Sequence, residues 1–203
     1  MIIFVGRSNV GKSTLIHRLT GKEVRRGKRP GVTRRPIEIN WRGKRVIDMP
    51  GFGFMSGVPK RVQERVKDEI VHFIEDHAEE IELAVLVIDG KAAPEIIERW
   101  ENRGEIPIDV EFFQFLRELE IPTLVALNKV DRVRNVEGTV NFLAEKFGIT
   151  HTEARRIIIP ISAKFGRNIE TLRRAISETL EKGKKASENL ENDVGDGLSD
   201  PVE

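Results

Sequence analysis

The chain has 203 residues, a formal net charge of +1, 33% charged residues and no cysteine. A chain of this length can bury a substantial core, and without cysteine it has neither a disulfide framework nor a cysteine-built metal site. No apolar stretch approaches the length of a membrane span, and the apolar start is too short for a signal peptide. We therefore expect a soluble, cytoplasmic protein that does not associate with membranes.

The first predicted elements enclose a glycine-rich loop. A short apolar strand over Ile2–Val5 leads into Gly6–Ser13, whose sequence is GRSNVGKS, and a helix is expected over Ser13–Leu19. This order of strand, glycine-rich loop and helix is the context that a phosphate-binding P-loop requires. The alternative is a glycine-rich turn that matches by chance, and the flanking strand and helix disfavour it.

The residue types of the loop suit a nucleoside phosphate. Gly6 and Gly11 lack Cβ, so the backbone can turn tightly and direct successive N–H groups into one concavity. The start of the helix adds its positive dipole end. Lys12 supplies a cation for the outer phosphates, and the Ser13 hydroxyl is placed to hold Mg²⁺.

The next segment, Lys22–Arg35, carries seven basic residues and one acid. Such a loop beside a nucleotide site favours RNA contact controlled by the nucleotide, and a solvated charged loop is the alternative. It has no aromatic residue on which bases could stack, so sequence-specific reading is not expected. Within it, Gly31 and Val32 precede Thr33, which we expect to complete the Mg²⁺ shell with Ser13 when a γ-phosphate is present. A plain turn threonine is the alternative.

Two further strands, Pro36–Trp41 and Arg45–Met49, are predicted to form a hairpin, because apolar and polar residues alternate in the first and a short turn joins them. The segment Asp48–Gly51, with the sequence DMPG, ends the second strand, where open α/β sheets bind ligands. There the Asp48 carboxylate can hold a Mg²⁺-bound water and the Gly51 N–H can meet a γ-phosphate. An ordinary Asp-x-x-Gly turn is the alternative.

The rest of the chain alternates strands and helices, which predicts an α/β fold with a parallel sheet covered on both faces. Buried strands are expected at the apolar runs Leu83–Ile88, Thr123–Leu127 and Ile157–Ile161. Helices are expected from Pro59 to His77, and over Ala93–Asn102, Asp109–Leu119, Val136–Phe147 and Ile169–Leu180.

Asn128–Asp131, with the sequence NKVD, follows one of these strands and predicts which base is bound. Guanine presents an N1–H and an exocyclic amine side by side, so one carboxylate can accept both hydrogen bonds, whereas adenine has no such pair. Asp131 is therefore the predicted discriminator, with Asn128 and Lys129 bracing the base and the loop. Ser162–Lys164 follows the last strand, and its backbone N–H groups are expected to reach the guanine O6. An ordinary Asn-Lys-Asp turn is the alternative.

In this order the motifs resemble the five-motif pattern of the small P-loop GTPases, over Ile2 to about Lys182. More narrowly, the P-loop sequence, Arg29–Thr33 (RPGVT) and Asp48–Phe54 (DMPGFGF) resemble the EngB (YihA/YsxC) family. Phenylalanines stand where tyrosines usually follow Pro-Gly, and the chain begins at its first strand, without the extension usual in bacterial members. Both differences indicate a divergent branch.

The resemblance implies a three-layer P-loop NTPase fold of the Ras-like type, with a mostly parallel six-stranded sheet and one antiparallel edge strand. It implies a monomer that binds GTP and GDP with Mg²⁺ and acts in large ribosomal subunit assembly, in a family also linked to cell division and septation. The expected partners are ribosomal large-subunit particles or rRNA, contacted through the Lys22–Arg35 loop.

Ras-like enzymes orient the attacking water with a glutamine just after Asp-x-x-Gly, and here Phe52 holds that position. We therefore predict slow hydrolysis, with the missing element supplied by a partner or a cation. In related GTPases an asparagine at the position of Asn9 helps to hold K⁺ against the phosphates, so K⁺ is a candidate; the alternative is that Asn9 only shapes the loop. A GTP-gated binding module with negligible hydrolysis is the alternative function. A small-molecule kinase is disfavoured by the Asn128-Lys129-x-Asp131 pattern, because kinases of that kind usually take ATP and lack this base reader.

The predicted site combines these assignments. Catalytic roles fall to Lys12, Thr33 and Gly51, and metal contacts to Ser13, Thr33, Asp48 through water, and Asn9 for K⁺. The residues expected to contact GTP are Gly6, Arg7, Ser8, Asn9, Val10, Gly11, Lys12, Ser13, Thr14, Gly31, Val32, Thr33, Asp48, Met49, Pro50, Gly51, Asn128, Lys129, Val130, Asp131, Ser162, Ala163 and Lys164.

The predicted domain organisation is a GTP-binding domain over residues 1–183 and an acidic tail over residues 184–203. Between Ala186 and Glu203 the chain has six acidic residues and no lysine or arginine. Because large apolar residues are also scarce there, we expect this tail to be disordered.

Overall fold

The computed structural model describes residues 1–23, 36–53 and 57–195, and for residues 186–195 only the backbone. The elements in chain order are β1 (Ile2–Gly6), α1 (Lys12–Thr20), β2 (Ile37–Trp41), β3 (Lys44–Asp48), α2 (Lys60–Asp76), η1 (Ala78–Glu80), β4 (Leu83–Asp89), α3 (Ala93–Glu101), α4 (Ile108–Glu118), β5 (Thr123–Asn128), η2 (Val130–Arg132), α5 (Val136–Phe147), α6 (His151–Ile157), β6 (Ile158–Pro160) and α7 (Ile169–Gly195).

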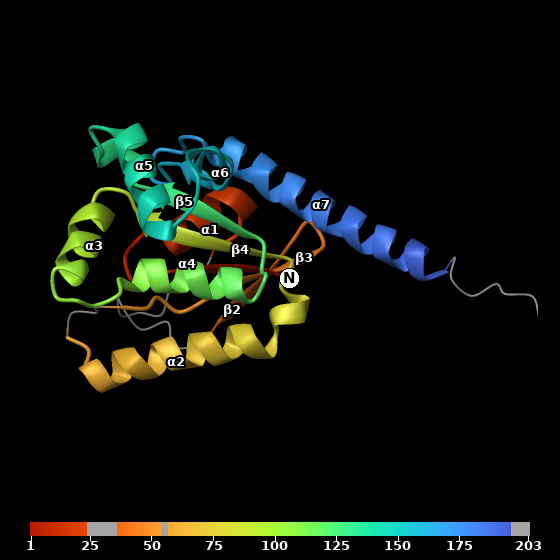
Figure 1. Cartoon of the computed structure of the whole chain (residues 1–203), viewed down its shortest axis with the longest axis horizontal. Coiled ribbons are helices and arrows are strands. Elements are labelled where there is room, and N and C mark those ends of the chain that lie inside the picture. The colour runs from red at the N-terminus through yellow and green to blue at the C-terminus, as the bar shows by residue number, and fades with distance from the viewer. Residues whose placement is uncertain (24–35, 54–56, 196–203) are drawn as a thin grey trace, which may run out of the picture.

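The strands form one six-stranded sheet in the order β2-β3-β1-β4-β5-β6 (Figure 1). Strand β1 pairs in parallel with β3 on one side and with β4 on the other, and β5 and β6 continue the parallel pairing. The edge strand β2 pairs antiparallel to β3 through the predicted hairpin. The expected mostly parallel sheet with one antiparallel edge strand is therefore confirmed.

Helices cover both faces of the sheet, because side chains of each strand alternate between two cores. Ile3 and Val5 of β1 belong to the core that α2, α3, α4, α5 and α6 close. Ile2 and Phe4 belong to the second core, which α1 and α7 close. The buried strands β4 and β5 contribute apolar side chains to both cores, which explains why their sequences are continuous apolar runs. The result is the three-layer architecture that the sequence predicts.

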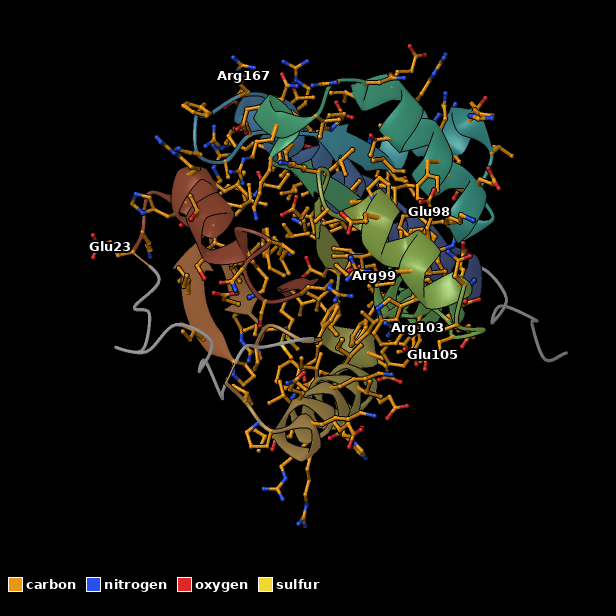
Figure 2. The ribbon with its side chains drawn as sticks, turned by 90° about the vertical axis from the view of Figure 1, so that its left-hand side faces the viewer. Glu23, Glu98, Arg99, Arg103, Glu105 and Arg167 are labelled. Atoms are coloured by element: carbon orange, nitrogen blue, oxygen red, sulfur yellow. The ribbon has the colours of Figure 1, made fainter. Side chains whose placement is uncertain are left out.

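The helices present apolar stripes inward and charges outward. In α2, Val66, Ile70 and Ile74 are buried, as the helical period predicts. Helix α3 buries Ala93 and Ile97, and Figure 2 shows the charged side chains of its outer face and of the turn that follows it. These stripes pack into the two cores together with the strands, so the functional groups are expected in the loops and at the ends of helices and strands.

The C-terminal third differs from the prediction in two places. The apolar run Ile157–Ile161 is not all strand, because α6 ends at Ile157 and β6 spans only Ile158–Pro160. Helix α7 continues through Gly195, so residues 184–195, expected to be an irregular tail, are helical (Figure 1). Apart from Gly195, the residues of that segment are tolerated in helices, and this tolerance outweighs the polarity of the segment. The remaining tail, residues 196–203, lies outside the described residues.

The core assignment of α4 leads to a stability prediction. Phe113 is 1% exposed and stacks on Phe147 of α5 with ring centroids 4.1 Å apart. Replacing Phe113 with alanine should lower the free energy of unfolding by about 3–5 kcal/mol, because it removes buried area and leaves a cavity. Urea denaturation measures this loss.

Phe165 provides the matched control, because its side chain is 59% exposed. Phe165→Ala should change the free energy of unfolding by less than about 0.5 kcal/mol. Equal losses in the two variants would contradict the placement of Phe113 in the core.

Candidate functional site

The loop between β1 and α1 has the tight backbone that its glycines predict. Asn9 and Gly11 have positive φ angles of 66° and 95°. A Cβ on Gly11 would lie 2.4 Å from Nδ2 of Asn128, and one on Gly6 would lie 2.4 Å from the carbonyl oxygen of Val87 in β4. Both glycines are therefore required by close approach to neighbouring strands as well as by backbone conformation.

Lys12 begins α1 and is buried beside two oxygen atoms, one from the last residue of β3 and one from the residue after it. Its ammonium donates to Oδ1 of Asp48 and to the carbonyl oxygen of Met49. Ser13 Oγ donates to Oδ2 of the same Asp48 carboxylate at 3.0 Å. Lys12 is 8% exposed and Asp48 1%, so the predicted phosphate cation and the predicted metal carboxylate meet in one desolvated place.

These groups fit a bound Mg²⁺. The ion takes oxygen ligands in octahedral geometry, binds few protein groups directly and usually keeps several waters. The Ser13 hydroxyl and the Asp48 carboxylate supply such oxygens next to each other and beside the P-loop. Among the described residues no three His, Cys, Asp or Glu side chains are grouped to hold a metal, so the oxygen pair of Ser13 and Asp48 beside the P-loop is the candidate.

The segment after β3 continues along the P-loop. Ser8 N donates to the carbonyl oxygen of Phe52 at 3.0 Å, and Phe52 N donates to that of Gly6 at 3.3 Å. A Cβ on Gly51 would lie 2.8 Å from Oγ of Ser8. Gly51 is thus held against the P-loop, where its predicted partner, a γ-phosphate, would be. The Phe52 ring is fully buried and stacks on Phe112 of α4, with centroids 4.1 Å apart and planes 3° apart.

A second cation, that of Arg7, lies partly buried beside this segment, and no sequence pattern predicts its partner. Arg7 forms an ion pair of 3.7 Å with Asp109, in the first turn of α4. Burial raises the pKa of Asp109 to about 6, the positive charge of Arg7 opposes this, and Asp89 adds to it. Asp109 had been predicted only as the start of a helix, because its partner is remote in the sequence.

Asn128, at the end of β5, joins two loops. Its Nδ2 donates to the carbonyl oxygen of Val10 at 2.8 Å, and its Oδ1 accepts the Ala163 N–H at 2.9 Å. The side chain is 2% exposed. These two hydrogen bonds are the geometry expected of a residue that braces the loops. The Ala163 N–H was expected to face the guanine O6, but it donates to Asn128 instead.

Lys129 links the base-reading loop to the P-loop. Its backbone is left-handed, with φ 62°, and its ammonium donates to the carbonyl oxygen of Asn9 at 2.7 Å and to Oδ2 of Asp89 at 2.6 Å. Oδ1 of Asp89 accepts hydrogen bonds from the N–H groups of Lys91 and Ala92, the two residues before α3. Asp89 was missed in the sequence, although its place at the end of β4, between two motif-bearing strands, is a usable signal.

Asp131 lies in η2 and faces the loop after β6. Its Oδ1 accepts a hydrogen bond from Ser162 Oγ at 2.5 Å, and this bond holds the pKa of Asp131 below its ordinary value. Arg18 of α1 donates to the carbonyl oxygens of Ala163 and Lys164 and so ties the loop after β6 to α1. Asp131 is therefore ionised at neutral pH and held where a carboxylate can accept from a base.

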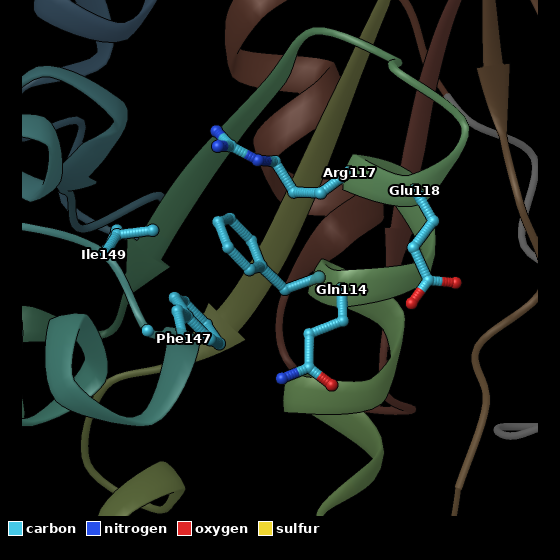
Figure 3. A pocket seen from close by; sticks show the side chains of 7 residues that line it. Gln114, Arg117, Glu118, Phe147 and Ile149 are labelled. Atoms are coloured by element: carbon cyan, nitrogen blue, oxygen red, sulfur yellow. The ribbon is translucent and has the colours of Figure 1, made fainter.

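Most of the predicted site residues come together at the carboxyl ends of β1, β3, β5 and β6. Gly31, Val32 and Thr33, and the Lys22–Arg35 loop apart from Lys22 and Glu23, lie outside the described residues. A separate hollow lies between α4 and the end of α5 (Figure 3), lined by Phe113, Gln114, Arg117, Glu118, Phe147, Gly148 and Ile149. None of the predicted site residues lines it.

The comparisons with known proteins agree with this geometry. A family model described as "50S ribosome-binding GTPase" matches residues 1–129. A probable GTP-binding protein EngB of Pyrococcus horikoshii is 70% identical over 88% of this chain and 83% of its own length. The crystal structure of a probable GTP-binding protein EngB, 70% identical, superposes with a TM-score of 0.86 over 89% of this chain and 98% of its own.

A more distant solved structure is Era in complex with MgGDPNP and a segment of 16S ribosomal RNA. It is 28% identical, with a TM-score of 0.61 over 88% of this chain and 55% of that one. The fold and its loops thus define a P-loop GTPase. At 70% identity over most of the chain, this protein belongs to the EngB family of GTP-binding proteins.

In the part of the chain that the structure describes, none of the helices has the length and apolar character needed to cross a membrane.

The contact between Gly11 and Asn128 leads to a prediction about affinity. Gly11→Ala should weaken GDP binding at least about tenfold, since its Cβ must displace the Asn128 amide and loosen the P-loop. Calorimetric titration of GDP in the presence of Mg²⁺ measures the effect.

Gly21, at the C-terminal end of α1, is the matched control. It too has a positive φ, 71°, but a Cβ there would have no atom within 4 Å. Gly21→Ala should cost about 1 kcal/mol of stability and leave GDP affinity unchanged within about twofold. If both variants lost the same affinity, the Asn128 contact would not be the cause.

Proposed function

We propose that this chain is a GTP-operated switch that binds GTP and GDP with Mg²⁺, hydrolyses GTP slowly and acts in large ribosomal subunit assembly. The observation that carries the proposal is the convergence at one sheet edge of the Lys12–Asp48–Ser13 cluster and the Ser162–Asp131 pair. The Lys12–Asp48–Ser13 cluster has the charges that a magnesium triphosphate requires, and the Ser162–Asp131 pair has the carboxylate that guanine requires. Their joint presence distinguishes a guanine-nucleotide site from a general phosphate site.

Each protein group has a defined part in binding. The Lys12 ammonium, now paired with Asp48, would turn to the outer phosphates, which present equivalent oxygen acceptors. Ser13 and Asp48 would then be free to hold Mg²⁺, which neutralises the charge that develops on the phosphates. Gly51, which lies against Ser8, would offer its N–H to the γ-phosphate. Asp131 would accept both guanine hydrogens.

The position of Phe52 supports slow hydrolysis. Its ring is fully buried against Phe112, so this residue neither hydrogen-bonds a water nor faces the phosphates. A monovalent cation is one replacement for the missing glutamine. Asn9 is exposed in the P-loop, where it would hold K⁺ against the phosphates. The cation would neutralise charge in the transition state. A partner protein or RNA is the other replacement.

The ribosomal role is supported by the relatives. The matching family model describes 50S ribosome-binding GTPases, and Era, of the same fold, has been crystallised with 16S ribosomal RNA. For this chain we propose large-subunit particles or rRNA as the partner, with the basic Lys22–Arg35 segment as the contact. A role in cell division or septation would follow indirectly from ribosome supply. A cytoplasmic, monomeric protein, built as a GTP-binding domain over residues 1–183 with an acidic extension, fits this role.

The base preference is the first test. The unchanged chain should bind GTP and reject ATP, and Asp131→Asn should lose affinity for GTP roughly a hundredfold or more, because two charge-assisted hydrogen bonds are lost. The variant should instead accept xanthosine triphosphate, whose 2-oxo group matches an amide donor. Competition against a fluorescent guanine nucleotide measures both effects.

Ser162→Ala is the control for this test, because it removes the hydroxyl that holds Asp131 and leaves the carboxylate. It should bind all guanine nucleotides more weakly while still rejecting the xanthine and adenine forms. A preference of the unchanged chain for ATP would refute the proposal.

The second test concerns hydrolysis. Single-turnover rates should be at least about tenfold higher in KCl than in NaCl at equal ionic strength. Asn9→Ala should abolish this difference while retaining GDP binding. Equal hydrolysis rates in KCl and NaCl would refute the proposed role of K⁺.

Adding purified large ribosomal subunits to the same assay distinguishes a hydrolysing GTPase switch from a GTP-gated binding module. A GTPase of the assembly pathway should hydrolyse faster with the particles. A GTP-gated binding module would bind the particles without any increase in rate.

A further inference from the structure

Asp109 is a buried carboxyl that the proposed chemistry does not use. It is 1% exposed, and among the described residues its Oδ1 and Nη1 of Arg7 have no hydrogen-bond partner, although the two residues form an ion pair at 3.7 Å. Desolvating such a pair is expensive, and apolar residues of similar volume often stabilise a core as well or better. Stability alone therefore explains this pair poorly.

Arg7 connects Asp109 to the segment that follows Gly51. Its backbone forms a parallel bridge with Phe52, and a Cβ on Gly53 would lie 3.4 Å from Cζ of the Arg7 guanidinium. The guanidinium thus lies directly against Gly53. Because Asp109 holds the end of the Arg7 side chain, it limits the movement of this segment away from the P-loop.

The same face of α4 also holds Phe52. Phe112 follows Asp109 by three positions, so both side chains project from one face of the helix. The Phe112 ring is 1% exposed and stacks on the fully buried Phe52 ring. One turn of α4 therefore holds the Gly51–Gly53 segment at two points. Asp109 acts through its ion pair with Arg7, and Phe112 acts through ring stacking on Phe52.

The consequence concerns the third phosphate. GTP differs from GDP only by the γ-phosphate, and Gly51 is the residue after β3 proposed to donate its N–H to it. Gly51 is held against Ser8 by the same segment that α4 grips. Holding a donor in place before binding reduces the entropy lost on binding. This gain applies to GTP and not to GDP, because only GTP has the γ-phosphate that accepts from Gly51.

We propose that Asp109 is a positioning residue that, through Arg7, holds the Gly51–Gly53 segment against the P-loop and thereby raises affinity for GTP relative to GDP. This inference rests on the proposed function, since it takes the Gly51 N–H as the γ-phosphate donor. Asp109 touches neither nucleotide nor metal in this account; it acts on the nucleotide through the Arg7 side chain.

The experiment compares affinities for GDP and for a non-hydrolysable GTP analogue, both with Mg²⁺, by calorimetry. Asp109→Asn should lower the preference for the GTP analogue by about fivefold or more, within the usual range of coupling between sites, while GDP affinity stays within about twofold. Arg7→Met should give the same loss, and the double variant no additional loss, because both residues act through one contact.

Two further variants keep the result interpretable. The pair Arg7→Met with Asp109→Leu removes both charges at similar volume, so it should fold even if Asp109→Asn leaves Arg7 unpaired and unstable, and it should show the same lost preference. Glu111→Gln is the matched control, because Glu111 lies on the same helix and pairs with Lys67 at 2.7 Å on the surface. Its nucleotide preference should equal that of the unchanged chain.

The outcomes separate the inference from the function. An unchanged preference in Asp109→Asn and in the double apolar variant, with GDP bound normally, would overturn the role of Asp109 alone. A parallel loss of GDP and GTP affinity would also overturn it, since that result indicates a general structural role. Failure of the unchanged chain to bind GDP would remove the proposed function itself.

Discussion

The site depends on one amide side chain, that of Asn128, which joins loops from three strands. Its amide group donates to the loop after β1, and its oxygen accepts from the loop after β6. Gly11 has no side chain because this amide occupies the place of a Cβ. Asn128 contacts both loops with one buried side chain, and Lys129 adds a second link from its ammonium to the carbonyl oxygen of Asn9. The relative positions of the phosphate-binding and base-reading loops decide whether one nucleotide can reach both.

Two cation–carboxylate pairs, each with a buried carboxylate, lie at the two ends of the Asp48–Gly53 segment. Lys12 and Asp48 meet where the segment leaves β3, and Arg7 and Asp109 meet where it passes α4. Each pair connects the P-loop to another element, so movement of the segment must change one or both. Buried charges are costly to leave unpaired, and such pairs therefore favour discrete positions over gradual displacement. This is the property expected of a switch.

Much of the fold could be predicted because its periodicities are strong. The apolar runs of β1, β4 and β5 and the stripe of α2 leave little ambiguity, and parallel strands bring their carboxyl ends to one edge. The run Ile157–Ile161 was misread at its start, since a short apolar run suits a helix end as well as a strand. Asp109 and Asp89 escaped notice because an isolated carboxylate carries no pattern until the fold supplies its partner.

The hydrogen bond from Ser162 to Asp131 has a consequence for cells that become acidic. Because this bond keeps the pKa of Asp131 low, the carboxylate stays charged well below neutral pH and continues to choose guanine. The Asp109 carboxyl, with a pKa near 6, would gain protons over the same range. Mild acidification would therefore leave the choice of purine intact while weakening the ion pair between Asp109 and Arg7.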